Sequence, residues 1–397
     1  MNCNYLKNKL LANFIKHILA FLIFTIAFAA NAEEVRVTIF SQSQIKTLVF
    51  ETEEGKYSLV ADNRLLMRLK KNAIIYFTIV GKGISVWDQD EHLGIFNELY
   101  LTASSRRSIF KVEPAVPALK ARSYDGDLKV TAVGGNLKIE NYVDVNDYLS
   151  GVVESEAGPR APYEYYKTQA IISRTYLYEK IWREGVDKYT LMDNVNHQVY
   201  LSRNHKNNII RQAVNHTTDL IIVDSTNMPI IAVFHSNSGG QTANSEDVWL
   251  SSTPYLKSVI DSFSLKQHNS IWRDTVSADR WIKYLTTNGI KINTPKAKID
   301  NLTYSPTSRE RCYRYMTDTI PLKKIRTDFG FKSAWFSIKP KAGGRVLEFT
   351  GYGYGHGVGL SQEGAMEMAR RNYSFIDIIN FYYRGVQIVN IHNIEKR

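Results

Sequence analysis

Residues 148–185 read YLSGVVESEAGPRAPYEYYKTQAIISRTYLYEKIWREG, and the character of the sequence changes within them. The segment 163–184 contains neither Gly nor Pro, Pro162 suits the first turn of a helix, and Gly185 follows as a C-terminal stop. Glu164 places negative charge near the N-terminus of this helix, where the helix dipole favours it. The pattern therefore predicts a helix over residues 163–184. Its apolar side is expected to comprise Tyr163, Tyr166, Ala170, Leu177 and Ile181.

Upstream of this helix, from about residue 35 to 145, the pattern is typical of β strands. Val35, Val37 and Ile39 alternate with polar residues, which is the period of a half-buried strand. Turn signals such as Gly134-Gly135 separate the apolar runs. Further strands are predicted in this region at residues 57–60, 73–80, 109–112 and 128–133. Two more are predicted downstream of the helix, at residues 220–223 and 230–234.

Downstream, two helices are predicted within residues 361–384, the second beginning at a cap of Ser374 and Asp377. The sequence thus predicts an α+β protein. We expect a β-rich N-terminal region, residues 33–140, packed on a mixed α/β region, residues 141–397, that holds a long substrate cleft.

The N-terminus has the pattern of a secretory signal peptide. Residues 1–17 carry Lys7, Lys9 and Lys16 and no acid, and the apolar run 18–30 ends in the small-x-small pattern Ala30-Asn31-Ala32. No second run approaches the roughly 18 apolar residues of a membrane span. We therefore expect cleavage after residue 32 and export to the periplasm, the cell wall or the extracellular space. An uncleaved anchor is the alternative.

The composition excludes several classes of protein. A chain of 397 residues with 44% hydrophobic and 22% charged residues is typical of one large or two globular domains. Removal of residues 1–32 would take away Cys3 and leave Cys312 alone, so no internal disulfide is expected. The net charge of +11 indicates an anionic partner, either a wall polymer or a nucleic acid on charge alone.

A first candidate site lies just before the predicted helix. Glu154 and Glu156 precede it, while Lys167 and Arg174 lie seven residues apart within it and therefore share a face. An acid opposite two cations is a plausible general acid/base site. A solvated loop with ordinary surface charges is the alternative, and spacing alone does not separate the two glutamates.

A second candidate is the segment FHSNSGGQT, residues 234–242, followed by EDVW, residues 246–249. Small hydroxyl residues and paired glycines after an apolar strand allow a backbone to approach a ligand closely. A polar sugar-binding loop is favoured over a plain turn. A serine nucleophile would need G-x-S-x-G, which is missing. The expected ligand contacts are His235, Ser236, Ser238, Gly239 and Gly240.

A third candidate is GYGYGHGVGLSQ, residues 351–362, in which glycines alternate around His356. We expect this backbone to lie close to a sugar and the imidazole to donate to a glycan oxygen. The register gives neither a dinucleotide fingerprint nor a phosphate loop. Neither His197 with His205 nor His216 with His235 has zinc-site spacing, so no metal or cofactor is expected.

Taken together, these motifs resemble the SpoIID/LytB family of bacterial cell-wall proteins. The resemblance extends over about residues 140–390 and includes KTQA at 167–170, SRTY at 173–176 and HQVY at 197–200. It implies that Glu156, which closes the V-x-S-E pattern, is the catalytic acid. The matching motifs place Lys167, Arg174, Tyr200 and Gln362 among the substrate-binding residues, with the two cations assigned to the lactyl carboxylate or carbonyls of the substrate.

The resemblance implies a lytic transglycosylase that cleaves peptidoglycan glycan strands, typically strands stripped of stem peptides, with no nucleic acid as partner. One glutamate would protonate the leaving oxygen and then activate the 6-hydroxyl of N-acetylmuramate, which closes a 1,6-anhydro ring. Ordinary glycosidases use two carboxylates instead. Some members of the family are amidase enhancers, so a non-catalytic activator of an N-acetylmuramoyl-L-alanine amidase is the alternative function.

Overall fold

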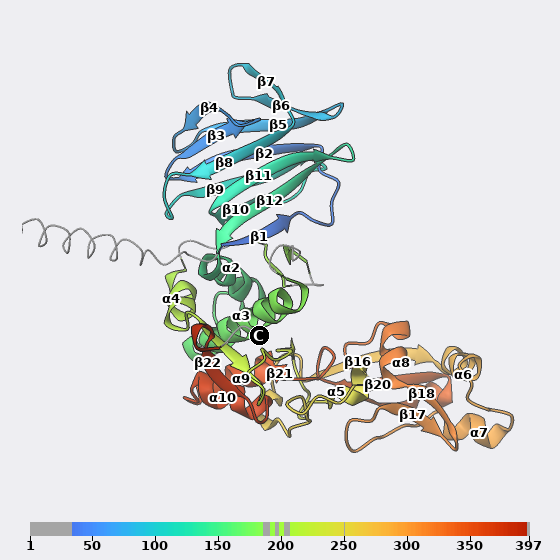
Figure 1. Cartoon of the computed structure of the whole chain (residues 1–397). Helices are drawn as coiled ribbons and strands as arrows, with labels where there is room; N and C mark the ends of the chain where they lie inside the picture. The colour runs from blue at the N-terminus through green and yellow to red at the C-terminus, as the bar shows by residue number, and fades with distance from the viewer. Residues whose placement is uncertain (1–33, 186–190, 195–197, 202–206, 250, 395–397) are drawn as a thin grey trace, which may run out of the picture.

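A computed structural model describes residues 34–185, 191–194, 198–201, 207–249 and 251–394 (Figure 1). The expected signal peptide, residues 1–32, lies outside this part of the chain. Within it, no helix combines the length and apolar character that crossing a membrane requires. Helices and strands both contribute extensively, and the N-terminal half is rich in strands, which confirms the α+β prediction.

The N-terminal half is a sandwich of two sheets. One has the strand order β13-β1-β12-β11-β8-β3-β4 and the other β10-β9-β2-β5-β6-β7, and all pairs are antiparallel except β1 with β13. The strands are β1 Glu34–Ile39, β2 Thr47–Glu54, β3 Tyr57–Ala61, β4 Arg64–Leu69, β5 Ile74–Val80, β6 Gly83–Trp87, β7 His92–Phe96, β8 Glu98–Ala103, β9 Ile109–Val116, β10 Arg122–Asp125, β11 Asp127–Val133, β12 Asn136–Asp144 and β13 Leu191–Met192.

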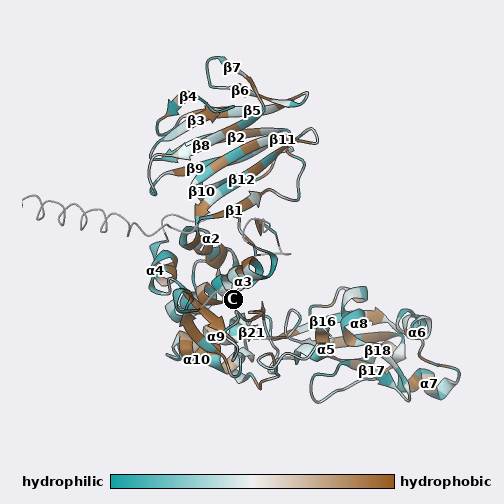
Figure 2. Ribbon diagram, in the orientation of Figure 1, coloured by the Kyte–Doolittle hydropathy of each residue, from teal (hydrophilic) through white to brown (hydrophobic). Residues whose placement is uncertain are grey.

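The alternation read from the sequence places apolar side chains between the two sheets. Val35, Val37 and Ile39 are buried along β1, while their neighbours are partly exposed. Figure 2 shows the same alternation of hydrophobic and hydrophilic residues along the sandwich strands. Phe50 and Tyr57, from different sheets, meet edge to face with ring centroids 5.5 Å apart. Such packing joins the two sheets into one core.

Below the sandwich lies a helical body (Figure 1). The predicted helix forms as α3, Tyr163–Glu184, and Gly185 ends it with φ of 88°. Two clusters of buried apolar residues cover α3: Ala170 joins the sandwich core, whereas Ile171 packs against α9 and α10 in a second core. The other elements of this body are α2 Val145–Ala157, α4 Asn208–His216, β14 Leu220–Val223, β15 Phe234–His235, α5 Ser245–Trp249, β21 Leu360–Ser361, α9 Gln362–Arg370, α10 Phe375–Tyr382 and β22 Gln387–Asn390.

Two predictions in this body have different outcomes. The helix capped by Ser374 and Asp377 is confirmed, because both halves of the capping box are formed. The strand predicted at residues 230–234 is wrong in extent, since only β15, Phe234–His235, is a strand. β15 pairs with the equally short β21, and Ile230 instead donates its N–H to the Ile222 carbonyl.

Residues from β16 to β20, 271–352, form a third body with its own apolar core. A three-stranded antiparallel sheet, β16-β20-β19, packs against helices around the fully buried Trp281. The region 141–397 thus contains this additional body as an insertion beside the helical one (Figure 1). Its elements are β16 Ile271–Ser277, α6 Ala278–Thr287, α7 Pro295–Asp300, β17 Cys312–Tyr315, β18 Asp318–Pro321, α8 Leu322–Phe329, β19 Phe336–Lys341 and β20 Val346–Tyr352.

Candidate functional site

Both candidate glutamates lie on α2, a helix that the sequence analysis did not predict. The Asp144 side chain caps its N-terminus by accepting from the Asn146 and Asp147 N–H groups, and Gly158 ends it. Residues two apart on a helix point about 200° away from each other. Glu154 and Glu156 therefore face different surroundings, which resolves the ambiguity that their spacing left.

Glu156 lies half-buried in the last turn of α2. Its Oε1 accepts a hydrogen bond from the backbone N–H of Val199 over 3.3 Å. Burial raises the pKa of the Glu156 carboxyl above its ordinary value, and the Val199 N–H opposes this rise. Its place at the helix C-terminus disfavours negative charge as well. The result is a carboxyl that holds its proton more tightly than an exposed glutamate.

The N–H of Val199 is held in place by residues of three sequence motifs. The Gln198 side chain donates from Nε2 to the Ser173 carbonyl over 3.0 Å, which ties the segment carrying Val199 to α3. Ser173 Oγ accepts from Gln169 Nε2 over 3.3 Å. These amides are buried, so their hydrogen bonds fix one arrangement of the segment beside Glu156.

Tyr165 is a neighbour of Glu156 that sequence reasoning missed. Its buried hydroxyl donates to Gln169 Oε1 over 3.0 Å. Burial and the nearby charge of Glu156 raise the pKa of Tyr165, while the Gln362 side chain opposes the rise. Gln362, a predicted site residue, is thus a neighbour of Tyr165. In the sequence, Tyr165 lies in the run YEYY, residues 163–166, and nothing in this run distinguishes it from the other tyrosines.

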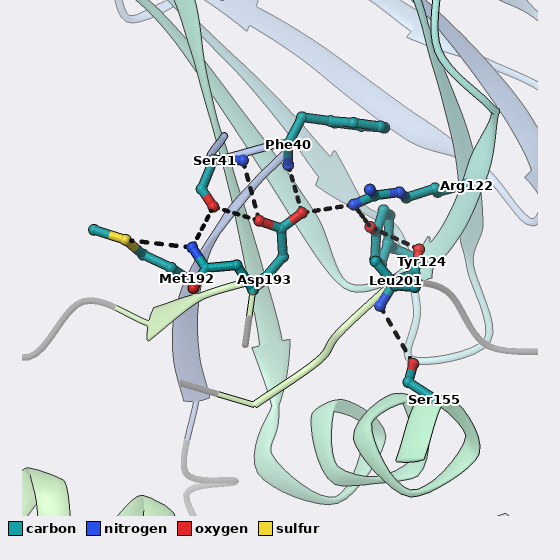
Figure 3. Close-up of polar contacts among 9 residues, drawn as sticks. Phe40, Ser41, Arg122, Tyr124, Ser155, Met192, Asp193 and Leu201 are labelled. Atoms are coloured by element: carbon teal, nitrogen blue, oxygen red, sulfur yellow. Dashed lines mark hydrogen bonds and ion pairs between the residues drawn. The ribbon is translucent and has the colours of Figure 1, made fainter. Parts of the chain in front are cut away.

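A pocket of about 490 Å³ adjoins this site on the side of the sandwich. Val199 and Leu201 line it, and the Leu201 N–H also approaches Ser155 Oγ at 3.4 Å (Figure 3). Asp193 also lines the pocket, accepts from the Phe40 N–H over 2.7 Å and pairs with Arg122 at 2.6 Å. The sandwich and the segment that carries Val199 thus line this pocket together, whereas Glu156 itself is not part of the lining. A longer substrate cleft remains a prediction.

Arg174 does not lie in a cleft, and its assignment to the substrate carboxylate is corrected. Its side chain is 1% exposed. Nη1 donates to the Thr217 carbonyl over 2.6 Å and Nη2 donates to Asn146 Oδ1 over 2.9 Å. Burial lowers the pKa of Arg174 to about 10. The residue ties α3 to α2 and to the end of α4, so its role is structural.

Lys167 and Tyr200 are likewise occupied by contacts within the protein. Lys167 Nζ pairs with Glu164 at 2.7 Å and lies over the Tyr163 ring. Tyr200 is 2% exposed, and its hydroxyl donates to Asn141 Oδ1 over 2.9 Å. Tyr200 is a core residue instead of a substrate contact, because solvent scarcely reaches it.

The FHSNSGGQT segment forms a tightly bonded loop. The Ser238 hydroxyl is fully buried and donates to Asp261 Oδ2 over 2.7 Å, so it is not free for a sugar. Gly240 donates its N–H to Ser264 Oγ over 2.9 Å. Gly239 has φ of +70°, and a Cβ there would come within 2.5 Å of the Tyr352 carbonyl carbon. Ser236 is half-buried and accepts a bond from Asn269 Nδ2 at 3.3 Å.

His235 and His356 lie together, with ring centroids 5.4 Å apart. Both nitrogens of His356 bond the backbone: Nε2 to the Phe234 carbonyl at 2.9 Å and Nδ1 to the Val358 N–H at 3.1 Å. The expectation that His356 donates to a glycan oxygen is therefore wrong, because its one donor is used. Burial lowers the pKa of His356 to about 4 and that of His235 as well, so both are neutral. His235 Nδ1 bonds the Val358 carbonyl, and its Nε2 is buried without a partner among the described residues.

The alternating glycines around His356 serve packing between protein segments. Gly359 has φ of +70°, and a Cβ on it would lie 2.2 Å from the Val233 carbonyl oxygen. On Gly357, with φ of +85°, a Cβ would lie 2.7 Å from Arg309 Nη1. The glycines do allow another group to approach the backbone closely, as predicted, but the approaching groups belong to the protein and not to a sugar.

Arg309 is a residue that no local pattern indicated. It comes from the inserted body and donates to the Gln241 and Ser238 carbonyls, at 2.5 and 2.6 Å. No group of three or more potential metal ligands occurs in the part of the chain that the structure describes. His197 and His205 lie outside that part.

Comparison with known proteins gives a consistent family. The sequence model of the family described as Stage II sporulation protein, SpoIID, matches residues 133–223. Stage II sporulation protein D of Bacillus subtilis is 32% identical over 268 residues, which cover 64% of this chain and 76% of that protein. The homologue of Bacillus amyloliquefaciens is 33% identical, with the same two shares. An amidase enhancer of Bacillus subtilis is 27% identical over 61% of this chain and 40% of its own length.

The matched segment contains α2 and α3, and thus Glu156, Tyr165 and the amides that hold Val199. The similarity to the two sporulation proteins extends far beyond it. The chain is therefore a member of the SpoIID/LytB family.

Proposed function

We propose that this protein is an exported peptidoglycan lytic transglycosylase in which Glu156 is the single acid and base. The observation that supports this most is the environment of Glu156. Burial favours its protonated form, while the Val199 N–H can stabilise the carboxylate. A group that must first give and then take one proton needs an environment in which both its protonated and its ionised form are accessible.

In the first step, protonated Glu156 gives its proton to the oxygen that links N-acetylmuramate to N-acetylglucosamine. The bond from the muramate anomeric carbon to that oxygen breaks. In the second step, the Glu156 carboxylate takes the proton of the muramate 6-hydroxyl. The 6-oxygen forms a bond to the anomeric carbon and closes the 1,6-anhydro ring. Glu156 ends protonated, and no water is consumed.

The experiment that tests this proposal is mass spectrometry of products from purified glycan strands. Wild-type protein should release 1,6-anhydromuramyl products from stripped strands. Hydrated reducing ends, with a mass higher by one water, would instead indicate a hydrolase. Export is tested separately, because mature protein recovered outside the cytoplasm should begin at Glu33.

A non-catalytic activator of an amidase is the second candidate. It is supported by the similarity to the amidase enhancer of Bacillus subtilis. An activator would bind wall and accelerate a partner N-acetylmuramoyl-L-alanine amidase without forming anhydro products. Assaying the two activities on one wall preparation distinguishes the candidates.

A further inference from the structure

A second pocket lies between the helical body and the inserted body. It has a cavity volume of about 110 Å³ and is bordered by Trp249 of α5, His356 and residues of α8. None of the predicted site residues other than His356 lines it. Its chemistry differs from that of the Glu156 surroundings, because positive charge dominates it.

Four cationic side chains line this pocket: Arg309, Arg311, Lys323 and Arg326. Two acids, Asp247 and Glu310, also belong to the lining. Even so, none of the four cations forms an ion pair with a carboxylate in the described ranges of the chain. Asp247 accepts from Asn244 Nδ2 instead, over 2.9 Å. The pocket thus carries positive charge without a bonded counter-ion.

The position of Arg309 makes this unbalanced positive charge energetically unfavourable. Its guanidinium is bonded to two backbone carbonyls, and burial, with the nearby charge of Arg326, lowers the pKa of Arg309 to about 10. Burial lowers the pKa of Arg326 as well. Both side chains are partly buried, and a cation partly withdrawn from water without an opposite charge is unfavourable. A bound anion would supply that charge, and charge-assisted bonds to guanidinium groups are among the strong ones.

The remaining wall of the pocket suits a sugar derivative better than a bare inorganic ion. Trp249 is 39% exposed, and its ring centroid lies 5.2 Å from that of His356. An aromatic face of this kind can cover the apolar face of a sugar ring. Ala243, Val248 and Leu322 add further apolar lining.

We propose that this pocket binds a carboxylate of the wall glycan, with Lys323 and Arg326 as its ligands and Trp249 against the adjoining sugar. The inference rests on the proposed function for the identity of the polymer. Stripped strands offer the lactyl carboxylate of N-acetylmuramate, whereas peptide-bearing strands offer only the carboxylates of their stem peptides. These two sources share one chemistry and can be separated by experiment.

The test measures binding of short stripped glycans by calorimetry, with Glu156→Gln present throughout so that no strand is cleaved. A chemically amidated sample of the same glycans lacks the carboxylates. Lys323→Gln and Arg326→Gln are compared with Lys324→Gln. Lys324 is the neighbour of Lys323 on α8, but it pairs with Asp328 and does not line the pocket. Each change removes one charge, so nonspecific attraction changes equally.

We expect Lys323→Gln and Arg326→Gln each to weaken binding of the carboxylated glycan by roughly tenfold, which corresponds to one charge-assisted bond. Amidation of the glycan should weaken binding to the protein by at least as much, and Lys324→Gln should have little effect. Equal affinity for carboxylated and amidated glycans, or equal losses in Lys323→Gln and Lys324→Gln, would overturn the proposal.

A third arm uses peptide-bearing strands. If these bind more weakly than stripped strands and are insensitive to Lys323→Gln, the lactyl group is the source. If they bind with the same dependence on Lys323, the carboxylate belongs to the stem peptide. Because binding is measured without turnover, carboxylate-dependent binding by a protein that forms no anhydro product would support this inference and contradict the proposed enzyme.

Discussion

The backbone N–H of Val199 points at Oε1 of Glu156 across 3.3 Å, although the two residues lie 43 positions apart in the chain. Gln198, the residue before Val199, is tied to α3 through the Ser173 carbonyl. The two hydrogen bonds together connect α2, through Glu156, and α3, through Ser173, with the segment around residue 199. A backbone N–H can stabilise the Glu156 carboxylate without a cation nearby. A cation at this place would lower the pKa of Glu156 and abolish its protonated form at neutral pH.

Glu156→Gln should reduce formation of anhydro products by roughly a hundred- to ten-thousandfold, since one group serves both proton transfers. The amide is nearly isosteric, so sedimentation with insoluble wall should be unchanged. Glu154→Gln is the matched control, because that residue points to another side of α2. Similar activity of wild type and Glu156→Gln would show that Glu156 is not the acid.

The raised pKa of Glu156 predicts the pH dependence of activity. Because the reaction starts from the protonated carboxyl, kcat/KM should decline on the alkaline side with a midpoint above the ordinary value of 4.5. The midpoint is read from initial rates across a pH series. A midpoint at or below 4.5 would contradict the effect of burial.

The same shift predicts a change in stability. Folded protein binds the Glu156 proton more tightly than unfolded protein does, so this group's contribution to the free energy of unfolding is present below pH 4.5 and is lost as pH rises through the folded pKa. Glu156→Gln removes this contribution to the free energy of unfolding. Thermal unfolding of both proteins across that pH range should show wild type losing stability relative to Glu156→Gln as pH rises.

Arg174→Gln should destabilise the fold by about 2–4 kcal/mol, because buried carbonyls, including that of Thr217, lose their donor. Lys167→Gln, on the same helix, should cost far less, since its ion pair with Glu164 is partly exposed. Urea unfolding measures both. If folded Arg174→Gln protein lost substrate affinity but no stability, a substrate role would be restored.

His356→Ala should lower the melting temperature by several degrees, because two backbone groups, at Phe234 and Val358, lose their partner. His392→Ala is a suitable comparison, since His392 is largely exposed and should have little effect. A His356→Ala protein with unchanged melting temperature and lower glycan affinity would favour direct contact with substrate.

Much of the fold could be predicted from local patterns. The β alternation, α3 and the capping box at Ser374 depend on neighbouring residues, and each is found where the pattern placed it. α2 was missed because its apolar residues follow directly on β12, where they also fit a strand. The inserted body was missed because neither Gly/Pro-rich linkers nor a change in composition mark its borders.

The candidate site was only partly predictable for a related reason. A motif shows which residues matter without showing whether they face solvent. Arg174, Tyr200 and Ser238 belong to the quoted motifs, yet each is buried and bonded within the protein. Arg309 and Tyr165 reach their places through tertiary packing, so no spacing in the sequence could connect them with His356 or Glu156.

The position of α3 between two apolar cores has a consequence for dissection of the protein. The segment that matches the family, residues 133–223, contains α3 together with α2, α4 and β14, but it lacks α9, α10 and all sandwich strands before β12 except for the end of β11. Expressed alone, that segment would expose Ile171 where α9 and α10 now cover it, and would also expose the apolar residues of β12 and α2 that join the sandwich core. The unit recognised by sequence comparison is therefore smaller than the packed unit around α3, and a shortened version of this protein should keep the sandwich together with α9 and α10.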